Sequence, residues 1–294
     1  MSKSLLKECV NKPDFLSVSG SRLYGTYTPE SDYDLRGFVI PPLEYLIGVN
    51  KFECMEMEGD HKIFSLKRFL DLVLSGDPQC TEILFAPEDH IKRISKVGNY
   101  IISLKMDMIS MKIYNRILGY SISEWRKAMA IKIVPEKRKT NKEELICSIK
   151  DLYKPQKESM DAIISILNSL DKKKVVSSVS GIGEKRKQDV IQFGYCRKSA
   201  SHAIRLVSQL IELMSEGKIT FPRPNAPFLL GIRNGEYSKS ELQKFYDDLV
   251  SQAENLKDKS ILPTKPNVKK VMEAYKNIIV AFLKQDTIFN QLGV

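Results

Sequence analysis

The sequence lacks any long hydrophobic run. No stretch of its 294 residues approaches the roughly 18 consecutive apolar residues that cross a bilayer. Residues 1–15 also lack the apolar segment of a secretory signal peptide. We therefore expect a cytoplasmic protein that does not enter a membrane.

Cysteine is scarce as well. Five cysteines, at positions 9, 54, 80, 147 and 196, form no CxxC pair, and their number is odd. Because a disulfide framework needs paired cysteines and a zinc site needs closely spaced ligands, the sequence predicts neither. We expect reduced thiols, most of them buried.

Positive charge is in excess. The chain has 46 Lys and Arg against 36 Asp and Glu, a formal net charge of +10, which indicates a polyanionic partner. Lysine and arginine concentrate in residues 132–142, 172–174 and 185–187. These segments are either solvated loops or a contact surface for phosphates. With 43% hydrophobic and 28% charged residues, the composition is that of a folded protein.

Two kinds of pattern divide the chain near residue 98. The first part mixes β-like runs with Gly and Pro breakers, and the expected strands are 15–18, 33–40, 52–57 and 61–64. A helix is expected from Ser65 to the Gly76-Asp77-Pro78 breaker. The second part has helical spacing, with the longest candidates at 100–123, 144–170, 188–215 and 239–256. We predict an α+β domain over 1–98 and a mostly helical domain over 99–294.

The segment 15–40, FLSVSGSRLYGTYTPESDYDLRGFVI, contains the first chemical signal. An apolar strand enters Gly20-Ser21, where the chain turns sharply and backbone N–H groups and a hydroxyl are free to face an anion. Asp32 and Asp34 then begin the next strand, and residues two apart on a strand point to the same side. Two carboxylates so close repel unless a cation lies between them, and hard oxygen ligands suit Mg²⁺ or Mn²⁺. The alternative is an Asp-rich turn that caps the strand.

A third carboxylate would complete a two-metal catalytic site. It must come from a neighbouring strand and point to the same side. Asp60, just before the apolar run at 61–64, is in a suitable position, and Glu56 and Glu58 are the alternatives.

Together these residues resemble the DNA polymerase beta-like nucleotidyltransferase superfamily. The string GSRLYGTYTPESDYDLRG resembles the branch often called the YcgL type, which is also known as an RNA-repair-associated polymerase beta family. The similarity covers nearly the whole chain, and it continues through FSLKRFLDLVLSGDPQCTEILFAP at 64–87, GYSISEWRKAM at 119–129, the stretch at 183–222 and IRNGEYS at 232–238. It implies a nucleotidyltransferase domain with a mixed sheet, followed by a helical domain that closes the nucleotide cleft and contacts the acceptor.

The resemblance implies roles for single residues in the first domain. Asp32 and Asp34 are expected to bind metal, and Gly20 and Ser21 to form the triphosphate-binding turn. Two arginines complete the expected phosphate site, Arg36, two residues after Asp34 on the same side, and Arg22. The family often has a second acidic residue after the Asp60 position, whereas this chain has Lys62 there.

The resemblance also implies a nucleotide-binding face in the second domain. Lys198, His202 and Arg205 match the family's Lys-x-x-x-His-x-x-Arg pattern, and their spacing aligns them on one face of a helix. That face is expected to close over the nucleotide. The alternative for His202 is a histidine that only forms a hydrogen bond within the helical region. His202 has no Cys or acidic partner at metal-ligand spacing, so it is a poor candidate for a metal ligand.

The expected activity is metal-dependent nucleotidyl transfer. The enzyme would bind an NTP such as ATP with two Mg²⁺ or Mn²⁺ ions held by Asp32, Asp34 and Asp60, and transfer the nucleotidyl group to a hydroxyl with release of pyrophosphate. RNA, such as a tRNA end, is the expected acceptor. A protein hydroxyl, as in toxin-antitoxin nucleotidyltransferases, and a small molecule fit the same residues. A further alternative is an inactive nucleic-acid-binding protein with this fold.

Overall fold

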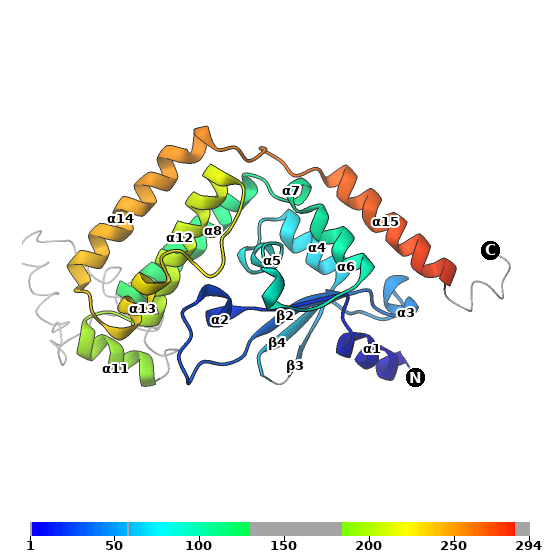
Figure 1. The fold of residues 1–294 in the computed structure, drawn as a ribbon, viewed down its shortest axis with the longest axis horizontal. Coiled ribbons are helices and arrows are strands. Elements are labelled where there is room, and N and C mark those ends of the chain that lie inside the picture. Colours follow the sequence, from blue (N-terminus) through cyan, green and yellow to red (C-terminus); the bar gives the residue numbers. More distant parts are fainter. Residues whose placement is uncertain (1, 58, 130–183, 286–294) are drawn as a thin grey trace, which may run out of the picture.

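The protein is described by a computed structural model for residues 2–57, 59–129 and 184–285 (Figure 1). A five-stranded sheet with helices is followed by a largely helical region, so the α+β prediction is confirmed. Within the described ranges, no helix is long and apolar enough to cross a membrane.

The sheet is mixed, as the family resemblance implied. Its strands are β1 (Phe15–Val18), β2 (Leu35–Val39), β3 (Cys54–Met57), β4 (His61–Ser65) and β5 (Ile91–Ile94). They lie in the order β3-β4-β2-β1-β5. The pairs β1–β2, β1–β5 and β3–β4 are antiparallel, and β2–β4 is parallel. The structure confirms the strand expected at 15–18, starts β2 two residues later than expected, and adds β5, which was not predicted.

Helices of the first half cover both faces of the sheet. They are α1 (Ser2–Asn11), α2 (Gly20–Tyr24), α3 (Leu43–Leu46), α4 (Leu66–Leu74), α5 (Pro78–Ile83), α6 (Lys96–Ser103) and α7 (Lys105–Met108), with a 3₁₀ turn at Glu88–His90. On one face Phe38 stacks between Phe15 and Phe69, with ring centroids 5.6 and 4.5 Å apart. On the other face Leu6 and Val10 of α1 join a separate buried cluster. Figure 1 shows α4, α5, α6 and α7 above the sheet and α1 below it.

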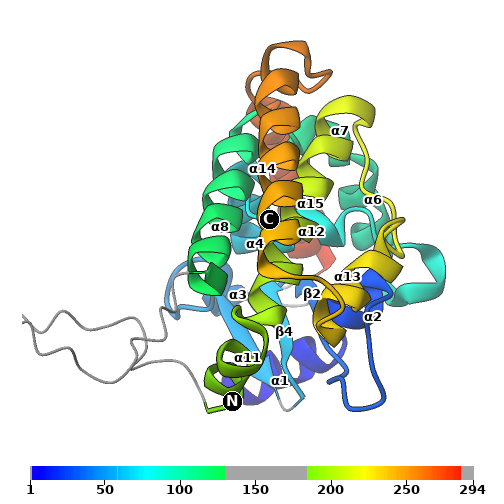
Figure 2. The ribbon, with the colours of Figure 1, turned by 90° about the vertical axis from the view of Figure 1, so that its left-hand side faces the viewer.

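The second half is a helical bundle built around one long helix. Its helices are α8 (Lys112–Met129), α11 (Glu184–Phe193), α12 (Arg197–Glu216), α13 (Ala226–Asn234), α14 (Lys239–Leu256) and α15 (Val268–Gln285), with a 3₁₀ turn at Lys257–Lys259. Helix α12 packs against α8, α13 and α14, and Figure 2 shows α8 and α14 alongside it. Helix α15 leaves the bundle and returns to α7 in the first half (Figure 1).

The helix predictions for this half vary in accuracy. The helix expected at 239–256 is α14, with the same bounds. The expected helix at 188–215 is two helices, α11 and α12, because Gly194 at φ +76° interrupts the chain. The segment expected at 100–123 is divided among α6, α7 and α8. The expected helix at 144–170 lies outside the described residues.

One hydrophobic core connects the two halves. Buried Phe38 and Phe69 of the first half belong to the same cluster as Ile117 and Leu210 of the second. Helix α5 lies between the sheet and the bundle in Figure 1 and packs against α8. The two halves therefore share one core. The division into domains at residues 98 and 99 stays a prediction.

Candidate active site

Two neighbouring strands begin at one corner of the sheet, and an aspartate directly precedes each. The parallel register of β2 and β4 pairs Arg36 with Lys62. Counting back two residues from this pair reaches Asp34 and Asp60, which lie just before the two strands. Parallel pairing therefore brings together two carboxylates from separate parts of the chain.

The carboxylates at this corner interact electrostatically. Burial, followed by repulsion from Asp60, raises the pKa of half-buried Asp34, and the charge of Asp32 makes a smaller contribution in the same direction. Asp32 and Asp60 are exposed. Over the described ranges, no group of three His, Cys, Asp or Glu side chains is close enough together to hold a metal ion. The three predicted ligands therefore meet at one corner without forming a closed three-ligand site.

Gly20 makes room for Asp34. Its φ is +64°, and a Cβ added to it would lie 1.8 Å from Asp34 Oδ2. Glycine is the residue that combines this backbone conformation with so close an approach. The Gly20-Ser21 pair opens the short helix α2, so the expected sharp turn is the start of a helix. Its role in binding the triphosphate stays a prediction.

Unpartnered polar atoms lie beside this corner. Ser17 and Ser19 are 1% and 5% exposed, yet neither Oγ has a hydrogen-bond partner among the described residues. Ser17 pairs across β1–β2 with Arg36, whose Nε is likewise buried and unpartnered, and whose Nη1 donates to Gln79 of α5. The Ser19 N–H donates to the Asp34 carbonyl at 2.9 Å. Neither serine was predicted, although a polar residue inside an apolar strand and a second one two residues later are a usable signal.

The alternatives for the third ligand differ in their surroundings. Glu56 forms an ion pair with Lys62 across β3–β4, with Oε1 and Nζ 2.7 Å apart. Glu58 lies outside the described residues. Asp60 is the candidate that interacts directly with Asp34.

Arg22 contacts the loop that leads to the aspartates. Its Nη2 donates to the carbonyl of Ser31 at 3.3 Å. Its guanidinium carbon lies 5.1 Å from the ring centroid of Tyr27 and 5.2 Å from that of Tyr33. Its expected pairing with a phosphate stays a prediction.

The predicted nucleotide-binding face of α12 runs from the surface into the interior. Lys198 is exposed, His202 is half-buried with Nδ1 3.9 Å from Glu124 Oε2, and Arg205 is buried. Burial and the positive charge of Arg205 lower the pKa of His202, so the imidazole is neutral at neutral pH. Arg205 Nη1 contacts Glu82 Oε1 at 2.5 Å. Arg205 thus forms an ion pair with the first half of the protein. Nucleotide binding by these three residues stays a prediction.

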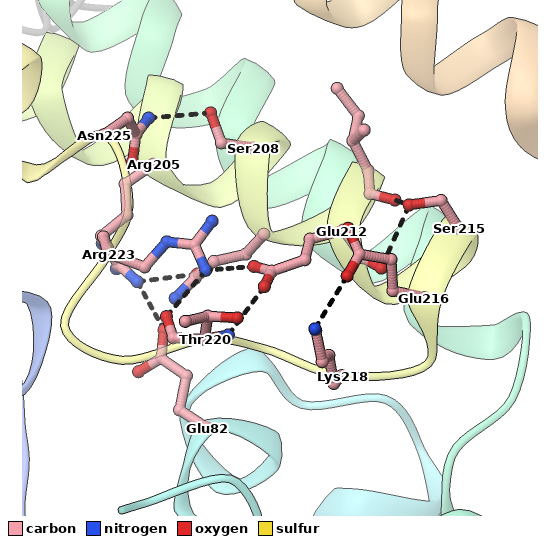
Figure 3. Close-up of polar contacts among 12 residues, drawn as sticks. Glu82, Arg205, Ser208, Glu212, Ser215, Glu216, Lys218, Thr220, Arg223 and Asn225 are labelled. Carbon is pink, nitrogen blue, oxygen red and sulfur yellow. Dashed lines mark hydrogen bonds and ion pairs between the residues drawn. The ribbon is translucent and has the colours of Figure 1, made fainter.

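The Glu82–Arg205 ion pair belongs to a buried polar network (Figure 3). The Tyr24 hydroxyl donates to Glu82 Oε2 at 2.7 Å, and Arg205 also donates to Gln209 at 2.8 Å. The guanidinium carbon of Arg205 lies 3.7 Å from the Tyr24 ring centroid. The network joins α2, which begins at Gly20 beside Asp34, to α5 and α12.

A mixed sheet with carboxylates before two adjoining parallel strands, followed by helices, has the fold of a polymerase beta-type nucleotidyltransferase. Residues 14–285 match the RNA repair pathway DNA polymerase beta family, and the chain belongs to that family. The assignment to the YcgL-type branch stays a prediction.

The chain is also similar to an uncharacterized 38.9 kDa protein from the nrdC-mobD intergenic region of Enterobacteria phage T4. The two are 24% identical over 293 residues, which cover 81% of this chain and 87% of the phage protein. No solved structure matches the chain at a significant level.

Proposed function

We propose that the protein transfers a nucleotidyl group from an NTP to a hydroxyl of RNA, such as a tRNA end, and releases pyrophosphate. The observation that carries the proposal is the interaction of Asp34 with Asp60, two carboxylates that lie directly before the parallel strands β2 and β4. Like charges side by side are costly unless a cation or a proton compensates them. The family's link to an RNA repair pathway favours RNA as the acceptor.

The donor set fits a divalent metal. Proteins of this fold typically use such an ion, and the oxygens of Asp32, Asp34 and Asp60 are the hard ligands that Mg²⁺ and Mn²⁺ prefer. These three residues would hold the metal. When bound, it activates the acceptor hydroxyl and neutralises charge on the triphosphate.

Other residues at this corner would bind and orient the triphosphate. Arg36 Nε and the Ser17 and Ser19 hydroxyls are buried donors without partners, and a buried donor gains most from an added acceptor. A guanidinium pairs strongly with phosphate oxygens. Gly20 has no Cβ that would displace the Asp34 carboxylate from this position.

The proposal is tested by a transfer assay with three forms of the protein: wild type, Asp34→Asn, and Asp89→Asn as a control. The Asp89 side chain is exposed and contacts His90. Each is incubated with every α-labelled NTP, Mg²⁺, and either total RNA or lysate protein. We expect label on RNA with wild type and with Asp89→Asn. We expect Asp34→Asn to lower the transfer rate at least about 100-fold. Substituting a residue that only supports a metal ligand already lowers metal affinity or activity by about 10 to 100-fold.

Chelation of the metal should abolish transfer as well. Label on protein would favour the protein-modifying alternative, and label on small molecules a small-molecule acceptor. RNA binding without transfer would favour the inactive nucleic-acid-binding alternative. Full activity of Asp34→Asn would contradict the assigned site.

A further inference from the structure

Two tyrosine rings are exposed on the loop between α2 and β2. Tyr27 is 54% exposed and Tyr33 is 43% exposed. Both rings lie against one guanidinium, that of Arg22, at 5.1 and 5.2 Å. Since exposed rings bury little apolar surface, hydrophobic packing does not account for them.

The loop that carries the rings is held in place by hydrogen bonds. Its Thr28 N–H donates to Ser31 Oγ at 2.8 Å, and the Ser31 N–H donates to the Thr28 carbonyl at 2.9 Å. The carbonyl of Thr26 accepts from Arg233 of α13 at 2.6 Å. Both tyrosines are therefore presented on a braced loop, which lowers the entropy cost of binding.

The loop leads directly into the candidate active site. Tyr33 lies between Asp32 and Asp34 in the sequence, and its carbonyl is 3.2 Å from Nε2 of His61, the residue after Asp60. A flat ligand on these rings would have its attached groups close to the carboxylates. A bracing role for Arg22 alone would need neither ring to remain exposed.

We propose that Tyr27 and Tyr33, with Arg22 between them, form a stacking site for an unpaired nucleobase. Aromatic rings beside a guanidinium are the chemistry that binds bases of single strands without strict sequence preference. The proposal rests on the proposed function, because it places the base of the acceptor strand or of the NTP at the same corner. The two sources share one chemistry, and separate probes distinguish them.

The test uses the full chain with Tyr27→Leu, Tyr33→Leu, the matching Tyr→Phe variants, and Tyr100→Leu as a control. Tyr100, on α6, has a similar exposed fraction of 45%. The probes are a fluorescent single-stranded oligoadenylate of about eight nucleotides, the same strand paired with its complement, and ATP. Thermal unfolding verifies that each variant is folded.

We expect the Leu variants to bind the single strand about tenfold more weakly, because stacking on an aromatic ring is lost. The Phe variants and Tyr100→Leu should bind as wild type does, and the paired strand should show no dependence on either tyrosine. A loss of ATP affinity alone would assign the stacking site to the base of the NTP. Unchanged affinity for both probes, equal loss in Phe and Leu variants, or a wild type that binds neither probe would overturn the proposal.

The transfer assay separates this proposal from the proposed function. Transfer by wild type that persists in both Leu variants with unchanged binding would leave the function in place and remove the stacking site. Tyrosine-dependent binding of the single strand without any transfer would support the stacking site and contradict the proposed function.

Discussion

Glu82 and Arg205 form an ion pair in the interior, where an unpaired charge is costly. Glu82 is 4% and Arg205 is 6% exposed, and the two lie 123 residues apart in the chain. Glu82 also accepts a hydrogen bond from Tyr24, whose own pKa is raised by burial. Because Tyr24 is the last residue of α2, the ion pair connects the helix that begins beside Asp34 to the bundle.

We predict that Glu82→Gln lowers the free energy of unfolding by about 3–5 kcal/mol, since it leaves the Arg205 charge buried without a counter-ion. Glu216→Gln is the matched control, because its pair with Lys218 is exposed and is worth about 0–1 kcal/mol. Urea unfolding followed by fluorescence of the single tryptophan, Trp125, measures both. Equal, small losses in the two variants would show that Arg205 is compensated by other groups.

Helix α14 shows how an element can be specified locally. Ser238 and Glu241 form a capping box at its start, with Ser238 accepting from the Glu241 N–H and Glu241 accepting from the Ser238 N–H. Buried Leu242, Tyr246 and Leu249 follow at helical spacing and pack on the bundle. Both signals are present in the sequence within a few residues of one another, and for this reason the predicted bounds agree with the structure.

We predict that Ser238→Ala lowers the free energy of unfolding by about 1 kcal/mol, because the first N–H groups of α14 lose their side-chain acceptor. Ser251→Ala, at an exposed position inside the same helix, should change it by no more than about 0.5 kcal/mol. Urea titration of both variants provides the comparison. A cost no larger for Ser238→Ala than for Ser251→Ala would mean that packing alone defines the start of α14.

At the scale of the whole molecule, the net charge of +10 is the feature that favours a polyanion. The lysine-rich segments 132–142 and 172–174 lie outside the described residues, and 185–187 is at the start of α11. Segment 185–187 is therefore not a loop. Whether the three segments are only solvated or contact phosphates is decided by measurement. Counterion release distinguishes the two, because only bound phosphates contribute to it.

We predict that RNA affinity falls steeply with salt, with a logarithmic slope of roughly −0.7 for each phosphate contact on a single strand. Charge reversal in 132–142 and 172–187 should reduce this slope and weaken binding about equally for all sequences, while ATP binding is unchanged. Charge reversal of Lys269 and Lys276, which are exposed on α15, is the control. Binding of a mixed RNA pool across a salt series measures the slopes. A flat series, or equal slopes in all variants, would favour a protein or small-molecule acceptor.

Features that depend on near neighbours could be predicted from the sequence. The strand at Phe15–Val18 follows from apolar and branched residues bounded by breakers, and α14 follows from its cap and spacing. The carboxylates Asp32 and Asp34 are recognisable because their spacing is local. The break at Gly194 was missed because the helical spacing continues across it, although the glycine is visible in the sequence.

Contacts between residues far apart in the chain could not be predicted in this way. Strand β5 has only four residues and no alternating burial, so the sequence shows no strand pattern there. Its extended conformation is stabilised by pairing with β1. The parallel pairing of β2 with β4 brings together the strand starts that follow Asp34 and Asp60. The antiparallel pairing of β3 with β4 places Glu56 opposite Lys62. The partner of Arg205 is likewise set by packing between the two halves. Local periodicity states which face of an element is apolar, but the pairing of elements depends on contacts between residues far apart in the chain.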